Sequence, residues 1–595
     1  MAGTCHFRKA ILGVLLCGAA VTPGLAQTVP NNAAPTREEI DRTDLRPTAR
    51  PPARLTVEGD VERAPCPLAA PDYAGITFTL SDVVFNNLAG LSAAELRPTF
   101  AEYVGRTVPL ATVCEIRDRA ATALRRRGFL AAVQVPPQEI ENGIVRFDVL
   151  MAKVVSVQVR GDAGRSESTI AGFLQTLTAM PVFNEQEAER TLLLARDLPG
   201  YDVRLTLRPA GGAPGEVIGE VTVLYRPYEV DLSVQNYGGQ DVGRFGGQLR
   251  AQFYGLTGLG DRTTLGAFVT ANFEEQQVVQ LFHDFGVGNQ GLRLAGRVTH
   301  AWTQPGGDVA SELDIESRTL LASVEATYPF VRSQSTNVSG AIGLDFVNQE
   351  VDILGETLNR DKLRIAYVRA DFDSIDPDSL GARPGFTAFA PRWRLGGSIE
   401  LRQGLGIFDA SEFCADCDVQ PSRVPGTSRG TVFRASALAE YRPLPNIAFS
   451  LAPRVQISDD ALFAYEEFSI GNYTVGRGYD PGALTGDSGF GFQSEVRFGT
   501  GIPQAANAVA LQPYLFFDAG WVSNRRDLLD GSERLFSAGG GVRAAYGDRA
   551  RLDLTFAVPL KKRPTGEEVG GVFIERRPDP RLLLTFTTRL LPWNR

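Results

Sequence analysis

Three short motifs in this sequence are built from residues that can do chemistry. Residues 486–489 read Gly-Asp-Ser-Gly, as around a serine-protease nucleophile, but a triad needs a histidine, and after residue 26 the chain has only His283 and His300, both in predicted strands. Residues 286–291 fit GxGxxG, yet strand-like alternation follows where a dinucleotide site needs a helix. Residues 414–417 read Cys-Ala-Asp-Cys without the βαβ context of a redox motif. We therefore expect no catalytic residues and no enzyme.

A glycine-rich segment around a single arginine indicates a different kind of chemistry. Residues 471–482 read Gly-Asn-Tyr-Thr-Val-Gly-Arg-Gly-Tyr-Asp-Pro-Gly, which suits a hairpin tip that bends sharply in a narrow space. Residues 516–520 read Phe-Phe-Asp-Ala-Gly, so that in a strand Phe516, Asp518 and Gly520 share one face. A guanidinium and a carboxylate can form two parallel hydrogen bonds. Taken alone, Arg477 is an ordinary solvated loop residue; together with Asp518 it is a candidate for an ion pair.

The elements that must position these residues belong to an exported chain. Residues 1–26 read as a signal peptide, with Arg8 and Lys9 before an apolar run and Gly-Leu-Ala before Gln27. No later stretch approaches the roughly 18 apolar residues of a transmembrane helix. The net charge is −9 and no basic stripe occurs, so nucleic acid is not an expected partner.

Four cysteines follow the signal peptide, and an even number in an exported chain predicts disulfides. Cys66 with Cys114 would tie the linker after the signal peptide to the first folded unit. Cys414 with Cys417 would close a tight loop or, less favourably, contribute to a metal site. Because zinc usually takes four ligands and only two histidines remain, we expect no metal.

From Tyr228 to the end, segments of roughly ten residues alternate between apolar and polar side chains. In one of them Phe449 and Leu451 alternate with Ser450, and Arg454 and Gln456 continue the polar face. Lipid demands an apolar exterior, whereas a wet lumen accepts charge. We therefore predict a transmembrane β-barrel of about 16 strands over residues 228–595, with a soluble sandwich or solenoid as the alternative. The glycine-rich segment falls in a long loop, residues 460–489, between the eleventh and twelfth predicted strands.

Between the signal peptide and the barrel, a β-α-α-β-β pattern of α+β type occurs twice, over residues 75–152 and 153–227. Residues 27–74 form a Pro-rich linker that can hold a short helix around 36–44. The second strand of such a unit lies at a sheet edge, which here means 129–135 and 201–207. The predicted elements are strands 76–85, 129–135, 144–151, 154–159, 201–207 and 217–225, and helices 92–104, 110–127, 167–177 and 184–198.

These features together resemble the two-partner secretion transporters, the TpsB family of haemolysin and adhesin exporters. The residues that carry the resemblance are the tandem units, the Leu198-Pro199-Gly200 turn, Gln-Asn-Tyr-Gly-Gly at 235–239, the Arg477-Gly478-Tyr479 tip and the 516–520 strand. The resemblance implies POTRA-like units in the periplasm and a barrel in the bacterial outer membrane. The family usually has valine before the motif arginine, where this chain has Gly476, and we expect a more loosely packed tip.

The resemblance also implies roles for particular residues. Loop six would fold back into the lumen with Arg477, Gly478 and Tyr479 at its tip, and Arg477 would pair with Asp518, which is flanked by Phe516 and Gly520. An unfolded substrate would add as a strand to the edges of the POTRA-like units. The residues expected to contact it are Phe129, Leu130, Val133, Tyr201 and Val203.

The function expected from this resemblance is export of a large secreted partner protein, unfolded in the periplasm, through the barrel. The other expected partners are outer-membrane lipid and, during biogenesis, the barrel-assembly machinery; no cofactor is expected. The alternative within the superfamily is an assembly factor for barrels or autotransporters, which usually carries more than two such units. A passive porin needs no periplasmic receiver, so the tandem units argue against it.

Overall fold

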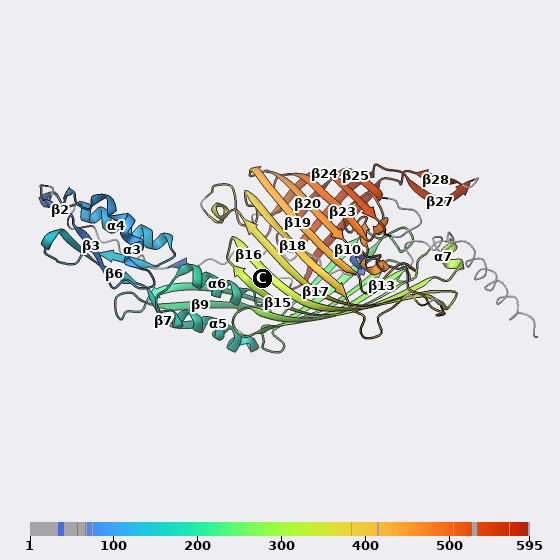
Figure 1. Ribbon diagram of the computed structural model, residues 1–595, viewed down its shortest axis with the longest axis horizontal. Coiled ribbons are helices and arrows are strands. Elements are labelled where there is room, and N and C mark those ends of the chain that lie inside the picture. Colours follow the sequence, from blue (N-terminus) through green and yellow to red (C-terminus); the bar gives the residue numbers. More distant parts are fainter. Residues whose placement is uncertain are drawn as a thin grey trace, which may run out of the picture.

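The computed structural model describes residues 34–40, 56–57, 66, 68, 70–73 and 75–592, apart from 163, 307, 382, 413, 415, 504, 526–531, 570 and 571. Two α+β units and a large barrel follow one another along the chain (Figure 1). The predicted signal peptide lies outside the described residues, as does most of the predicted linker. Among the residues described, no helix is long and apolar enough to cross a membrane.

The first unit is a three-stranded sheet covered by helix α4 (Thr112–Arg126), whose buried face is formed by Val113, Ile116, Ala120 and Leu124. Its sheet order is β3-β6-β5, with β3 and β6 parallel and β5 at an edge. The helix predicted over 92–104 is wrong: α3 ends at Leu96 and short 3-10 turns follow, because Pro98 has no N–H to donate. The other elements are β2 (Thr77–Thr79), β3 (Asp82–Asn86), α3 (Ala93–Leu96), β4 (Thr107–Pro109), β5 (Ala131–Gln134) and β6 (Ile144–Met151).

The second unit repeats the pattern and adds one short strand from the linker. Its sheet order is β1-β8-β9-β7, so β1 (Thr56–Val57) lies against the outer side of β8. The pairing is parallel and joins Thr56 to Thr206 and Val57 to Leu207. The edge at 201–207, which we expected to be free, is therefore occupied at its end. The other elements are β7 (Lys153–Arg160), α5 (Glu167–Ala179), α6 (Glu185–Arg196), β8 (Tyr201–Pro209) and β9 (Glu216–Tyr225).

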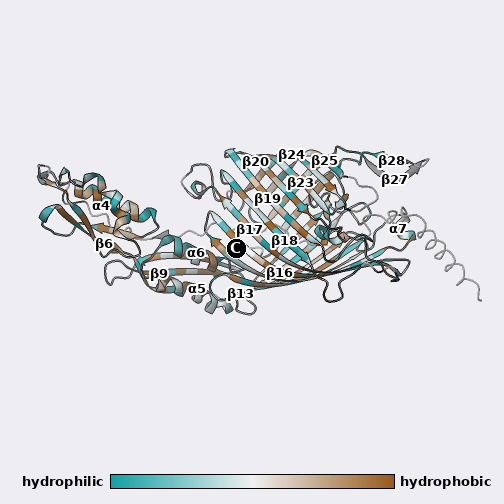
Figure 2. Cartoon of the chain, in the orientation of Figure 1, coloured by the Kyte–Doolittle hydropathy of each residue, from teal (hydrophilic) through white to brown (hydrophobic). Residues whose placement is uncertain are grey.

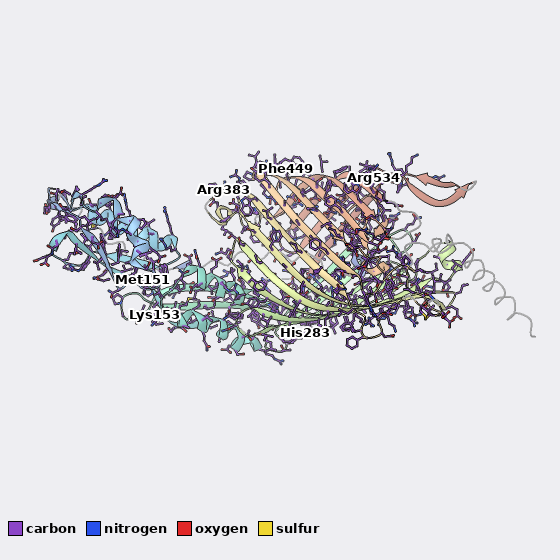
Figure 3. The ribbon with its side chains drawn as sticks, in the orientation of Figure 1. Met151, Lys153, His283, Arg383, Phe449 and Arg534 are labelled. Carbon is purple, nitrogen blue, oxygen red and sulfur yellow. A yellow bond between two sulfur atoms is a disulfide. The ribbon has the colours of Figure 1, made fainter. Side chains whose placement is uncertain are left out.

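The two units are joined closely, with Ala152 alone between β6 and β7. Met151 and Lys153, labelled in Figure 3, mark this junction. The backbone N–H of Glu185 donates to Gly128 O at 2.7 Å, and the N–H of Ala152 donates to Leu130 O at 2.9 Å. These bonds fix the second unit against the start of the edge strand of the first.

The barrel is a closed sheet of sixteen antiparallel strands, which confirms the predicted number. The first strand pairs with the last, for example Val234 with Phe586. Its strands are β10 (Tyr228–Gln235), β11 (Gly246–Tyr254), β12 (Arg262–Thr270), β13 (Gln276–Val287), β14 (Leu292–Thr303), β15 (Glu316–Arg332), β16 (Thr336–Ile353), β17 (Glu356–Ile375), β18 (Trp393–Gly404), β19 (Thr431–Leu444), β20 (Ile447–Ile457), β23 (Ser488–Phe498), β24 (Val509–Ser523), β25 (Ser532–Tyr546), β26 (Ala550–Pro559) and β29 (Arg581–Leu591). A short helix, α7 (Asp308–Glu312), and a hairpin of β27 (Arg563–Val569) with β28 (Val572–Arg576) extend its outer end (Figure 1).

Polar side chains of the barrel point inward, as predicted. On β20, Phe449 is 47% and Leu451 44% exposed, whereas Gln456 is 2% exposed. Figure 2 shows the resulting alternation of hydrophobic and hydrophilic residues along the strands. Arg402 of β18 reaches Asp345 of β16 at 2.8 Å across the inner face of the strand between them. The charges are thus paired within the lumen, and apolar side chains form the exterior.

The second unit is held against the periplasmic turns of the barrel. Arg332 makes a two-pronged ion pair with Asp197, at 2.6 and 2.8 Å. The Tyr225 hydroxyl donates to Tyr254 O at 2.7 Å. Burial raises the pKa of the Tyr225 phenol, which favours the protonated form that donates this bond. The barrel entrance and the second unit therefore share a common surface.

Candidate functional site

The connection between β20 and β23 folds back into the barrel. Within it, β21 (Phe468–Ile470) and β22 (Leu484–Gly486) form a small antiparallel hairpin. The buried side chains of Ile470 and Leu484 pack in one cluster with Val522 and Leu535 of the barrel strands β24 and β25. Apolar packing on the inner wall therefore places the tip of this loop, called loop six here, inside the lumen.

Two glycines shape the tip. Gly476 has a φ of +108°, a conformation that a valine would adopt only with strain. A Cβ at Gly478 would lie 2.8 Å from the backbone nitrogen of Pro559 and 3.0 Å from Ser537 Cβ, so the tip meets the wall without room for a side chain. The neighbouring Val475 is fully buried, and the more loosely packed tip expected from Gly476 stays a prediction.

The guanidinium of Arg477 forms bidentate hydrogen bonds with a carboxylate of the barrel wall. Its Nε donates to Asp518 Oδ2 at 3.0 Å and its Nη2 to Asp518 Oδ1 at 2.6 Å, the bidentate geometry that favours this pairing. The Arg477 backbone N–H donates to the same carboxylate at 3.0 Å. The guanidinium also lies 3.7 Å from the ring centroid of Phe516, in cation–π geometry. Asp518 is fully buried, so this contact is shielded from bulk water.

A second carboxylate, on β23, completes the site and was not found from the sequence. Glu495 Oε1 accepts from Arg477 Nη1 at 2.6 Å and from Arg543 Nη2 at 2.9 Å. Its other oxygen accepts from Arg497 Nε at 2.7 Å. The one signal in the sequence was its place on the polar face of a predicted strand, a property that many lumen residues share.

Tyr479 anchors the other side of the tip. Its hydroxyl accepts the backbone N–H of Lys561 at 2.9 Å and lies 3.1 Å from Phe536 O. Its carbonyl accepts from Arg581 Nη1 at 2.7 Å. The expected motif residues Arg477, Gly478 and Tyr479 are thus together on the wall, beside Phe516 and Asp518. Gly520 lies nearby, against Ile470 of loop six.

The short helix α2 (Arg37–Ile40) lies within the same lumen. Gln280 Nε2 of β13 donates to Ile40 O at 3.1 Å, and Gln349 Nε2 of β16 donates to Pro35 O at 3.4 Å. Ile40 is fully buried in a cluster that contains Phe463 and Tyr465 of loop six. Two segments, α2 and loop six, therefore occupy the pore together.

The edge strand of the first unit differs in detail from the expectation. The side chain of Val133 is buried in the core of the first unit, and those of Tyr201 and Val203 are buried in the core of the second. Phe129 forms an isolated bridge with Asn184, and Leu130 packs against the second core. These five residues thus do not form an open apolar groove. The remaining candidate for contact with the substrate is the backbone at the outer edge of β5.

The structure pairs the cysteines as the sequence suggested, Cys66 with Cys114 and Cys414 with Cys417. The first bond closes a loop with a sequence separation of 48 and attaches the linker to helix α4. The second closes a four-residue turn in the connection between β18 and β19.

Removal of the first disulfide is expected to destabilise the first unit. In the chain-entropy model a closed loop of this length contributes about 4 kcal/mol. The Cys66→Ser/Cys114→Ser variant should therefore unfold at lower denaturant concentration in the first unit while the barrel transition stays in place. Limited proteolysis across a urea series measures this, with Cys414→Ser/Cys417→Ser as the matched control. An unchanged midpoint would contradict the expectation.

A closed barrel of sixteen strands with a loop anchored on its inner wall, preceded by α+β units, defines a class of outer-membrane transport proteins whose POTRA units lie in the periplasm. The family model described as "Haemolysin secretion/activation protein ShlB/FhaC/HecB" matches residues 222–544, more than half of the chain. The model described as "POTRA domain, ShlB-type" matches residues 78–151. The chain belongs to the ShlB/FhaC/HecB family of two-partner secretion transporters.

Several proteins are similar to this chain over most of its length. The Heme/hemopexin transporter protein HuxB of Haemophilus influenzae (strain 86-028NP) is 22% identical over 537 residues, which cover 88% of this chain and 90% of HuxB. CdiB from Escherichia coli has a TM-score of 0.69 at 15% identity, covering 87% of this chain and 91% of that one. CdiB from Acinetobacter baumannii has a TM-score of 0.61 at 18% identity, covering 90% and 95%. At these identities the structures show a shared fold.

Proposed function

We propose that this protein binds one unfolded secreted partner protein in the periplasm and moves it through the barrel lumen to the cell surface. The family exports partner proteins, which supports transport as such. The observation that carries the capture step is the edge position of β5 in the sheet of the first unit, where no other strand of the described residues pairs with its outer side. The first unit lies at the end of the molecule far from the hairpin of β27 and β28 (Figure 1). An extended chain adds to such an edge by main-chain hydrogen bonds, which need no particular side chains.

The direction of the backbone groups identifies the residues of that edge. Leu130 O accepts the N–H of Ala152, so Leu130 faces β6. Because successive residues of an antiparallel strand alternate in direction, Ala131 and Val133 present their N–H and C=O groups outward. On the second unit, a passenger strand along all of β8 would have to displace β1 from Thr206 and Leu207.

Passage of the partner protein needs space in a lumen that α2 and loop six both occupy. Loop six is held by the buried, bidentate pair of Arg477 with Asp518, whose shortest contact is 2.6 Å. Helix α2 is held by hydrogen bonds to its backbone oxygens, by the packing of Ile40, and by an ion pair of Glu38 with Arg454 at 3.8 Å. The pair of Arg477 with Asp518 is the stronger contact, because it is shorter and has two parallel charged hydrogen bonds. We infer that α2 leaves first and that loop six yields or stays on the wall as the passenger passes. In this family, folding of the passenger outside the cell would drive the movement.

The proposal for β5 can be tested with a proline. Ala131→Pro removes one outward N–H and leaves the bonds to β6 in place, because proline is tolerated at a free edge. One lost hydrogen bond of about 1 kcal/mol weakens passenger binding about fivefold. Binding of the purified passenger segment to the full-length protein measures this, with Ala131→Val, which retains the N–H, as control. Equal binding by both variants would remove β5 as the capture site.

The passenger itself can be found by comparing the culture media of a deletion strain and a complemented strain. The proposal predicts that one or a few large proteins disappear from the medium on deletion and return with the wild-type gene. The alternative, an assembly factor, has support only at the level of the fold, from BamA of Haemophilus ducreyi at a TM-score of 0.50 and 12% identity. A general loss of outer-membrane barrels with an unchanged secretome would favour that alternative.

Two further partners follow from the exterior of the barrel. Exposed apolar side chains such as Leu249, Leu265 and Leu281 line its outer surface, and we propose that outer-membrane lipid covers them. We also propose that the barrel-assembly machinery inserts it, since closure needs β29 to pair with β10.

A further inference from the structure

The described residues of the loop 405–430, which are all but 413 and 415, lie between β18 and β19 and extend one wall of the barrel at its outer end. Strand β17 continues past the last residue of β18, whose pairing ends with Gly404 opposite Ile365. The loop satisfies the backbone groups that β17 would otherwise leave unpaired there. Leu405 N–H donates to Arg364 O at 2.7 Å, and Arg360 N–H donates to Gln420 O at 3.0 Å.

The Cys414–Cys417 disulfide shapes the part of this loop that turns toward loop six. Gln420 Nε2 donates to Cys414 O at 2.7 Å and to Cys417 O at 2.9 Å, so the closed turn holds Gln420. Two residues later, Ser422 N–H donates to Asp361 Oδ1 of β17 at 2.8 Å. The chain is thus fixed immediately before Arg423.

Arg423 joins the outgoing and returning ends of loop six. Its Nη1 lies 2.6 Å from Asp487 Oδ1 at the returning end. The same nitrogen lies 2.7 Å from Glu467 Oε1 and 2.8 Å from Leu462 O at the outgoing end. Asp487 is fully buried and also accepts the N–H groups of Leu462 and Arg525, each at 2.7 Å. The Gly-Asp-Ser-Gly motif therefore has a structural use, since its aspartate receives the arginine of another loop.

We propose that the described residues of this loop form a second anchor of loop six at the outer mouth of the barrel, with Arg423 and Asp487 as its positioning residues. The first anchor, Arg477 on Asp518, holds the tip inside the lumen. The second holds the two ends of the same loop where they leave the wall. The disulfide belongs to this device because it fixes the turn that presents Arg423. Charged hydrogen bonds in a buried setting hold such a contact more firmly than neutral ones.

Trypsin cleavage after Arg477 in the folded, full-length protein tests this anchor, because trypsin reaches the tip only when loop six leaves the wall. Arg423→Gln is expected to raise the cleavage rate roughly tenfold, the effect of losing hydrogen bonds to a charged group. Cys414→Ser/Cys417→Ser should raise it in the same direction, and Arg423→Lys should restore part of the protection. Arg429→Gln is the matched control: it removes one trypsin site from the same loop and a pairing with Glu412 in which both side chains are exposed.

Cleavage in Arg423→Gln no faster than in the Arg429→Gln control would overturn the anchor. Cleavage unchanged in the cysteine variant would remove the disulfide from it. Folding is checked by heat-modifiable migration and by intact peptides from the barrel strands, so an unfolded variant is recognised and replaced by Asp487→Asn, which must then show the same rise. The measurement needs no passenger, so its outcome is independent of the proposed secretion.

Discussion

Replacing Asp518 by alanine is expected to stop secretion of the partner protein while the barrel still inserts into the outer membrane. The substitution leaves the guanidinium of Arg477 with Glu495 alone and removes the acceptor of three hydrogen bonds from Arg477. Removing one partner of a buried pair costs about 3–5 kcal/mol, less where lumen water screens it. Even a loss of about 3 kcal/mol changes the ratio of wall-bound to released tip by about a hundredfold. Arg477→Ala should have the same effect.

The measurement is the amount of passenger in the medium, with heat-modifiable migration as the measure of barrel folding. Asp231→Ala is the matched control, because Asp231 is also a buried lumen carboxylate and pairs with Arg250 of the neighbouring strand. It should secrete normally. Normal secretion by both Arg477→Ala and Asp518→Ala would exclude the pair from the transport mechanism.

The barrel could be predicted from the sequence because its two faces meet different solvents. Phe449 and Leu451 against Ser450 and Gln456 predict both a strand and its orientation, and the structure places all four residues in β20 (Ile447–Ile457). The Arg477–Asp518 contact could be expected because both residues stand in recognisable motifs. The contact itself was implied by family resemblance, since 41 residues separate the partners and no periodicity brings them together.

The capture edge shows why other details could not be predicted. A strand edge was correctly expected at 129–135, but the same alternation that turns the backbone of Val133 outward sends its side chain into the core. Strand β1 has only two residues, and its pairing depends on the edge of a domain more than a hundred residues away. Such contacts are set by tertiary structure and leave no local pattern.

The contacts of Glu495 also leave no local pattern in the sequence. Replacing Glu495 is expected to have the second large effect. It is the hub that joins loop six to the wall: Arg477 comes from the loop, whereas Arg497 and Arg543 come from β23 and β25. Glu495→Gln keeps the shape of the side chain but removes its charge, which leaves three guanidinium groups close together. We expect this variant to lose secretion. We also expect the free energy of unfolding of the barrel to fall by about 3–5 kcal/mol before screening by lumen water, so that the barrel unfolds at a lower temperature.

The effect on barrel stability distinguishes Glu495 from Asp518. Asp518 accepts hydrogen bonds mainly from loop six, and its bond from the wall is a weak one from Ser537 at 3.3 Å. Asp518→Asn should stop secretion with little change in the temperature at which the barrel loses heat-modifiable migration, whereas Glu495→Gln should change both. A double-mutant cycle between Glu495→Gln and Arg543→Gln should give a coupling of about 1–3 kcal/mol, because the two side chains share two hydrogen bonds. Additive effects in that cycle, or an unchanged transition temperature in Glu495→Gln, would mean that the wall is stable without the hub and that Glu495 acts on the loop alone.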